Sequence, residues 1–147
     1  MDGFFGEFYH SIDSKGRVII PQDYRQDLGS DFYLSRGFDG CIWITPKDEW
    51  DSFRQQLRQL PTMDRESREF KRFFTSGATP CSFDKQGRIL IPVGLRNHAK
   101  IIKDVVLVGM DNRIELWSLE KWTDQGEVTN ERMDDITAHV RELGLLF

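Results

Sequence analysis

The sequence is organised around one short stretch that occurs twice. The residues DSKGRVIIP at positions 13–21 recur as DKQGRILIP at positions 84–92, an offset of 71. Farther along, a second block of matches continues at an offset of 72, so one inserted residue separates the two registers. This block pairs Gly37, Asp39, Ile42, Ile44 and Trp50 with Gly109, Asp111, Ile114, Leu116 and Trp122. The repeat predicts two related structural units, with any functional surface present twice in each chain.

The elements within one copy follow from local patterns. Alternating apolar residues at 8–12 predict a half-buried strand that enters the turn at 13–16. The continuous apolar runs 18–20 and 89–91 favour strands covered on both faces. Each run ends at a proline, and proline is accepted at the first position of a helix. We therefore expect short helices at 21–28 and 92–99.

The remaining strands and helices have equally local signals. Strand pairs are expected at 32–34 with 41–45 and at 105–108 with 113–117, around Asp-Gly and Asp-Asn turns. Thr45 is expected to cap a helix at 46–60, since threonine side chains often accept hydrogen bonds from a first helical turn. Helical spacing also predicts helices at 62–75 and 129–143. The expected division of the chain is a first module at 5–50, a helical connector at 51–75, a second module at 76–122 and an acidic C-terminal helix at 123–147.

Composition excludes some classes of protein. No apolar run approaches the roughly 20 residues that span a bilayer, and the first ten residues do not form a secretory signal. Cys41 and Cys81 lack the spacing of a metal site or a disulfide framework. The sequence thus predicts a soluble cytoplasmic protein.

The net charge is −4, but residues 111–147 hold nine acidic and four basic residues, which leaves residues 1–110 at +1. The front of the chain can therefore hold local basic clusters that contact DNA phosphates.

The repeated turns are the candidate DNA-binding sites. Each carries two basic residues close to a glycine, and the whole set is Lys15, Arg17, Lys85 and Arg88, with Ser14 and Gly16 beside them. Lysine offers a point charge to a phosphate, whereas the planar arginine fork can bridge two phosphate oxygens or bind a guanine edge. Asp13, Asp84 and Gly87 are assigned to the structure of the turns, because aspartate commonly hydrogen-bonds a turn backbone.

Other polar and aromatic residues are weaker candidates. Arg25, Arg96 and Arg36 could extend a basic strip behind the turns, or lie on ordinary solvated helix faces. The basic residues between 65 and 72 alternate with acids, which favours an exposed connector helix. The tryptophans are expected in the core. The three histidines are scattered, so we expect no catalytic residue, metal site, cofactor or small-molecule substrate.

The two turn segments, together with RGFDGCIWITPKDEW, FFTSGATPCSFD and LVGMDNRIELWSLEKW, resemble the MraZ family over nearly the whole chain. This resemblance implies an α+β fold of two tandem swapped-hairpin modules of the SpoVT-AbrB type with flanking helices. It also implies a nucleoid-associated transcription regulator, usually a repressor. Members form closed homo-oligomeric rings and bind direct repeats upstream of the division and cell-wall gene cluster. The interiors of the two turns differ, so Lys15 and Arg17 are the stronger candidates. An antitoxin-like protein-interaction module is the alternative, since related swapped-hairpin modules occur in antitoxins.

Overall fold

The computed structural model describes residues 2–146. Its strands are β1 (Glu7–Ser11), β2 (Arg17–Ile19), β3 (Phe32–Arg36), β4 (Ile42–Pro46), β5 (Thr79–Cys81), β6 (Arg88–Leu90), β7 (Asp104–Gly109) and β8 (Ile114–Ser118). Its helices are α1 (Gln22–Leu28), α2 (Lys47–Arg58), α3 (Arg65–Gly77), α4 (Val93–Ala99) and α5 (Leu119–Glu142), with a short 3₁₀ turn at Phe38–Gly40. The expected α+β class with two repeated modules is confirmed.

The two copies of the repeat share one antiparallel sheet. Its strand order is β1-β7-β8-β4-β3-β5, which reads the same from both edges when each strand is replaced by its equivalent in the other copy. Each copy contributes a hairpin, β3–β4 or β7–β8, to the centre. Each outer strand then pairs with the hairpin of the other copy, β1 with β7 and β5 with β3. The copies are therefore intertwined around an approximate two-fold axis.

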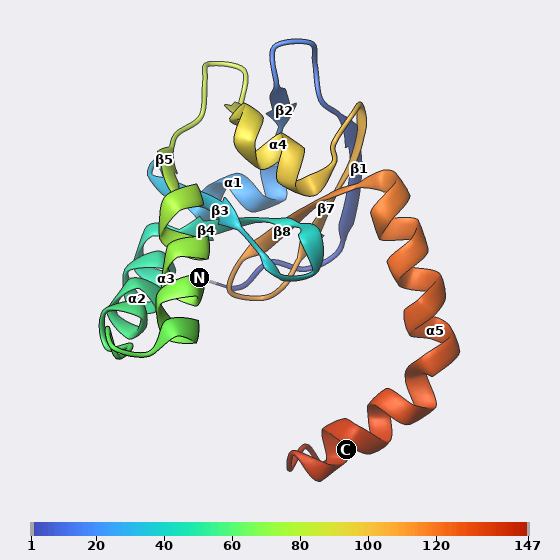
Figure 1. The fold of residues 1–147 in the computed structure, drawn as a ribbon. Helices are drawn as coiled ribbons and strands as arrows, with labels where there is room; N and C mark the ends of the chain where they lie inside the picture. Colours follow the sequence, from blue (N-terminus) through green and yellow to red (C-terminus); the bar gives the residue numbers. More distant parts are fainter. Residues whose placement is uncertain (1, 147) are drawn as a thin grey trace.

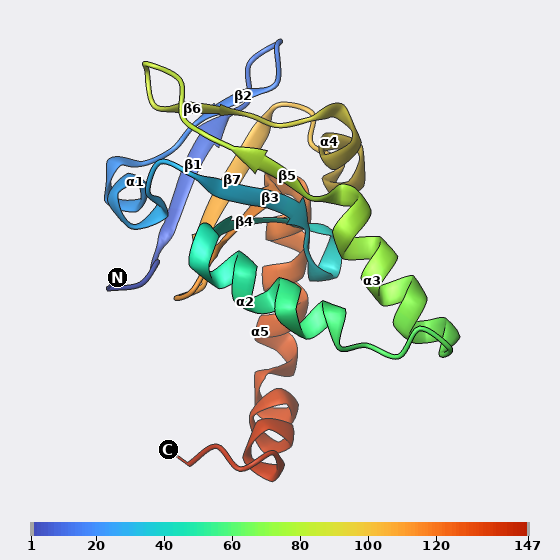
Figure 2. The ribbon, with the colours of Figure 1, turned by 90° about the vertical axis from the view of Figure 1, so that its left-hand side faces the viewer.

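Three layers make up the body of the molecule (Figures 1 and 2). On one face of the sheet lie α1, α4 and a two-stranded ribbon of β2 and β6, which together enclose the larger core cluster. On the other face, α2 and α3 cover a second cluster that includes Trp43, Phe74 and Trp117. Trp43, Trp50 and Trp117 are buried, as expected, whereas Trp122 is only partly buried. The start of α5 also packs on this cluster, after which the helix projects from the body (Figure 1).

Several element predictions needed correction. Thr45 does not cap a helix: it is a buried residue of β4, and α2 begins directly after Pro46 without a side-chain cap. The expected helix at 129–143 is part of the longer α5, whose cap is Ser118. The apolar runs 18–20 and 89–91 are not covered on both faces, because the ribbon packs on the sheet through one face alone. The middle residues of the two apolar runs, Ile19 and Leu90, are 39% and 57% exposed.

None of the helices within residues 2–146 is both long and apolar enough to cross a membrane. Cys41 and Cys81 are free thiols. Within the same residues no cluster of histidine, cysteine, aspartate and glutamate side chains could hold a metal ion.

Candidate nucleic-acid interface

The two repeated turns project side by side from one end of the molecule (Figures 1 and 2). In the first turn, Asp13 Oδ1 accepts hydrogen bonds from the backbone amides of Lys15 at 3.0 Å and Arg17 at 2.9 Å. In the second, Asp84 Oδ1 accepts from the amides of Gln86 and Arg88, both at 2.9 Å. These contacts have the same geometry in both turns. The structural role expected for the two aspartates therefore fits their contacts.

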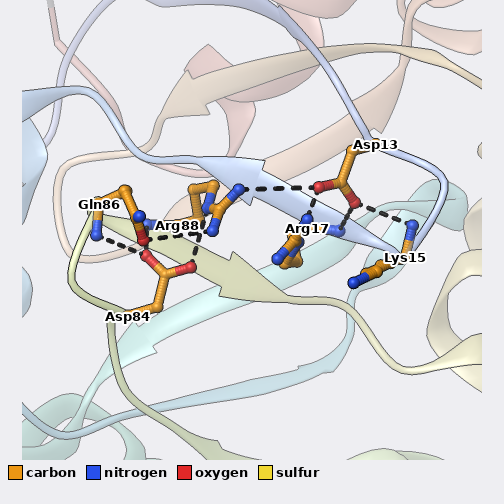
Figure 3. Close-up of polar contacts among 6 residues, drawn as sticks. All are labelled: Asp13, Lys15, Arg17, Asp84, Gln86 and Arg88. Carbon is orange, nitrogen blue, oxygen red and sulfur yellow. Dashed lines mark hydrogen bonds and ion pairs between the residues drawn. The ribbon is translucent and has the colours of Figure 1, made fainter.

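The second oxygen of each aspartate holds an arginine side chain (Figure 3). Arg17 Nε donates to Asp13 Oδ2 at 2.7 Å, and Arg88 Nε donates to Asp84 Oδ2 at 2.8 Å. Both carboxyl pKa values lie below the usual range, chiefly because the backbone amides of Arg17 and Arg88 donate to the ionised form. The aspartates thus remain charged at neutral pH. Each fixes its arginine through Nε, which leaves the two Nη groups for other contacts.

The two turns differ in how far their arginines are engaged. Arg88 Nη2 also donates to Gln86 Oε1 at 3.2 Å, and Arg88 Nη1 lies 4.0 Å from Asp13 Oδ2. For Arg17, no hydrogen bond from either Nη group is present within the part of the chain that the structure describes. Gln86 occupies the position that Lys15 holds in the first copy, so this difference originates in the sequence.

The β2–β6 ribbon joins the two turns and presents their arginines together. Its register pairs Arg17 with Leu90, Val18 with Ile89 and Ile19 with Arg88. Directly opposed residues of an antiparallel pair lie on the same face. Val18 and Ile89 are buried against the sheet, so the four other residues form the outward face of the ribbon. That face alternates two arginines with two exposed apolar residues.

Ile19 and Leu90 were missed in the sequence analysis, because continuous apolar runs indicated strands covered on both faces. Successive side chains of a strand point to opposite faces, so Val18 and Ile19, like Ile89 and Leu90, must lie on opposite faces of the ribbon. If only one face of the ribbon is covered, one residue of each pair has to be exposed. The exposed side chains of Lys15 and Lys85 lie on the turns beside this face, and Ser14, directly before Lys15 in the chain, is exposed as well.

Arg25 and Arg96 lie behind the turns rather than on solvated helix faces. Arg25 Nε donates to the carbonyl of Ile20 at 2.7 Å, and Arg96 Nε donates to that of Ile91 at 3.0 Å. Each guanidinium packs against the turn glycine of the other copy, Arg25 on Gly87 and Arg96 on Gly16. They therefore support the turns and add positive charge beneath them.

Arg36 does not belong to this surface, so the alternative that placed it in a basic strip does not hold for this residue. Its Nη1 donates to the carbonyl of Phe73 at 2.8 Å and to Ser76 Oγ at 3.0 Å. It ties the end of α3 to β3, on the side of the sheet opposite the ribbon. The position of Arg36 along the sequence could not reveal this, since the contact joins residues about forty positions apart.

Comparison with known proteins agrees with the repeated architecture. The family model described as "MraZ protein, putative antitoxin-like" matches twice in tandem, at residues 4–73 and 74–143. The chain belongs to the MraZ family. It is 47% identical to the transcriptional regulator MraZ of Pediococcus pentosaceus over 97% of this chain and 99% of that protein. It is 46% identical to the proteins of the same name from Natranaerobius thermophilus and Halothermothrix orenii, over 93% and 97% of this chain and 96% and 99% of theirs. Both matches to the MraZ model include one Asp-x-x-x-Arg turn and one strand of the ribbon.

Proposed function

We propose that this chain is a DNA-binding transcriptional regulator and not an enzyme, and that its β2–β6 ribbon with the two turns is the DNA-contacting surface. The observation that carries the proposal is the outward face of the ribbon, where Arg17 and Arg88 alternate with Ile19 and Leu90. The major groove of B-DNA admits a two-stranded ribbon. The relatives of this chain in the MraZ family carry the name transcriptional regulator, which supports the same function.

Each group on this surface has a role suited to its chemistry. The Nη edge of an arginine held through Nε can bind guanine O6 and N7, and an apolar side chain can contact a thymine methyl group. Lys15 and Lys85, exposed on the turns, reach phosphates on either side. The two turns and the arginines behind them bring together six cations and two carboxylates, which makes this end basic although the chain is acidic. These cations are Lys15, Arg17, Arg25, Lys85, Arg88 and Arg96.

The first turn is proposed as the stronger reader of base sequence. Its arginine keeps both Nη groups available, whereas Arg88 shares its Nη groups between Gln86 and Asp13. The first turn also retains a lysine directly before its glycine.

The proposal is tested by fluorescence anisotropy with a DNA fragment from upstream of the chain's own gene and with a shuffled fragment. The Arg17→Ala, Arg88→Ala double variant should lose the preference for the native fragment. The matched control is Arg54→Ala, Arg58→Ala, which removes the same charge from exposed positions on α2, at the other end of the molecule. Equal loss in both double variants would mean that total charge alone drives binding, and the ribbon would not be the reader.

We also propose that the chain acts as a homo-oligomeric ring that binds direct-repeat boxes, associates with the nucleoid and represses its own gene cluster. Once one subunit of a ring has bound a box, the turns of the other subunits are held close to the neighbouring boxes, and their effective concentration there is high. A fragment with several boxes should therefore bind far more tightly than one with a single box. Equal affinity for both fragments would contradict binding by a ring.

An antitoxin-like interaction module is the second candidate, favoured by the description of the family model and by the exposure of α5. Deletion of residues 129–147 separates the two candidates. Loss of binding to another protein with intact DNA binding would support the interaction module.

A further inference from the structure

The C-terminal helix α5 leaves the body after its first turns (Figures 1 and 2). Leu119 and Trp122 pack on the core cluster beside α2 and α3, and Trp122 Nε1 donates to Glu7 at 2.9 Å. The helix then continues to Glu142, and none of its 24 residues is buried. At 1.5 Å per residue it is about 36 Å long. Apolar side chains beyond the body remain open, with Met133 44% and Leu143 74% exposed.

One line of positions along α5 has the spacing of a coiled-coil seam. Apolar and small residues recur at alternating steps of three and four. They are Leu119, Trp122, Gly126, Thr129, Met133, Ile136, Val140 and Leu143. Such a seam keeps one face of a helix directed at a partner helix over several turns. The first two positions already pack on the chain's own body, whereas the six from Gly126 onward lie outside both core clusters formed by residues 2–146.

The charges of α5 are arranged so that two copies of this acidic helix can approach. Every carboxylate of the helix lies at an outer position, away from the seam and from the positions that flank it. These carboxylates are Glu120, Asp124, Glu127, Glu131, Asp134, Asp135 and Glu142. The flanking positions carry the uncharged residues Thr123, Gln125, Asn130 and Thr137, together with Arg132 and His139. Like-charge repulsion between the outer faces is therefore kept far from the contact.

The sizes of the seam residues fit an antiparallel pair of identical helices. With Met133 opposite Ile136 of the second copy, Thr129 lies opposite Val140 and Gly126 opposite Leu143. The small residues near the body then face the large residues near the tip, and each layer is filled. A parallel pair would instead place glycine against glycine and leucine against leucine, and would bring the two bodies to the same end.

A groove at the root of α5 fits the same arrangement. It encloses about 470 Å³ and is lined by Tyr9, Trp122, Gly126 and Thr129, among other residues. Tyr9 is 59% exposed there. Antiparallel pairing brings the tip of the second helix, with its exposed Leu145, to this groove. Both unpartnered surfaces, the root groove and the apolar tip, are thereby covered at once.

We propose that α5 is a self-association surface, in which residues 126–143 pair antiparallel with the same residues of a second copy. The contact is two-fold and self-complementary, unlike the head-to-tail contact that a closed ring requires. The inference goes beyond the proposed function, because it holds whether or not the ribbon binds DNA. The ribbon and turns lie at the other end of the body from the tip of α5 and stay exposed (Figure 1).

The first test compares two substitutions that add the same charge one half-turn apart. Ile136→Asp places a carboxylate in the central layer, and Ala138→Asp places one on the outer face. Sedimentation equilibrium of the full chain should show that the mass falls by half for Ile136→Asp and is unchanged for Ala138→Asp. Circular dichroism serves to verify that both variants are folded. An unchanged mass for Ile136→Asp, or an equal fall for both variants, would overturn the proposal.

The orientation is tested by disulfide cross-linking under mild oxidation. A mixture of Thr129→Cys chains with Val140→Cys chains should give a mixed disulfide, whereas each variant alone should give little. The parent chain, with its own two cysteines, provides the background. Cross-linking of Thr129→Cys to itself as readily as to Val140→Cys would show parallel pairing and would refute the antiparallel register.

DNA binding is measured on the same Ile136→Asp protein with a single-box fragment. Retained binding together with the halved mass is the expected result. If the parent chain binds no DNA but the mass halves, the proposed function fails while this inference stands. If the parent chain binds DNA normally and the mass of Ile136→Asp equals that of the parent, this inference fails while the proposed function stands.

Discussion

The guanidinium of Arg25, in the first copy of the repeat, packs directly against Gly87 in the turn of the second copy. Arg96 makes the equivalent contact with Gly16, where an added Cβ would lie 3.0 Å from Arg96 Cζ. Both glycines also have positive φ, 88° at Gly16 and 76° at Gly87. The two turns are thus buttressed by each other's copy, which couples the shape of one DNA-contacting turn to the other.

Substitution at Gly87 should therefore destabilise the protein. Gly87→Ala combines a left-handed backbone with displacement of the Arg25 side chain, at an expected cost of about 1–3 kcal/mol in the free energy of unfolding. Gly94→Ala, in α4, is the control: no atom lies within 4 Å of its added Cβ, and a helical alanine should stabilise by about 0.5–1 kcal/mol. Urea denaturation measures both. A Gly87→Ala protein as stable as the parent would contradict the buttressing role of Arg25.

Removal of the charge of Asp13 should lower sequence preference even though it makes the surface more basic. In Asp13→Asn the amide cannot accept from Arg17 Nε if its oxygen keeps the backbone contacts, so the arginine loses its anchor. We expect affinity for shuffled DNA to rise. The ratio of native to shuffled affinity should fall by about tenfold, since one bidentate arginine contact discriminates by about 1–3 kcal/mol. Anisotropy titrations with both fragments give this ratio.

The Asp84→Asn variant provides a comparison within the same chain. Arg88 keeps a second partner in Gln86, so the loss of preference should be smaller than for Asp13→Asn. If both variants bind both fragments more tightly by the same factor, the aspartates act as counter-charges and do not orient the arginines.

Lysine and arginine substitutions in the first turn should have different signatures. Lys15→Ala should weaken binding to all sequences and reduce the slope of log affinity against log salt by about 1, because one phosphate contact is lost. Arg17→Ala should instead relax the preference at particular base pairs of the box. A salt series for each variant, with single-base changes in the fragment, distinguishes the two effects. A change of base preference in Lys15→Ala would reverse these assignments.

Stability should fall as pH drops below neutrality, in part because of His98. Burial lowers the pKa of this imidazole, whose Nε2 lies 3.0 Å from the carbonyl oxygen of Cys41. The unfolded chain therefore takes up this proton first, near the usual histidine value of about 6.5. The free energy of unfolding should decrease as pH falls through that value, until the lowered folded pKa is passed. His98→Gln should reduce the pH dependence between 7.5 and 5.5. An identical dependence in both proteins would assign the effect to other groups.

Much of the local structure could be predicted from the sequence. Period-two and helical spacing, together with glycine and proline positions, located most of the strands and helices, including β1, both hairpins and α1. These signals act over a few residues, so they are legible in one copy at a time. The capping error at Thr45 arose because β4 runs directly into α2 without a loop. The predicted C-terminal helix was too short because the first part of α5 has only a weak apolar pattern.

The candidate site was partly visible in the same way. Asp13 and Arg17 are four residues apart, so their contact is local, and its recurrence in Asp84 and Arg88 drew attention to the turns. In contrast, the sequence left the place of Arg36 open, because its partners are near residue 75 in the chain. The exposure of Ile19 and Leu90 was missed because it depends on what covers a strand.

The sequence by itself therefore determined that the chain contains two copies of one unit, which elements each copy forms and which residues sit at the turns, because these depend on short-range sterics and on the spacing of apolar side chains. The tertiary structure alone decided that the outer strand of each copy pairs with the hairpin of the other, that β2 and β6 form a ribbon with an open face, and that Arg25 supports the opposite turn. Those features depend on contacts between residues that are distant in the chain, and either copy could satisfy the same local pattern with a different partner.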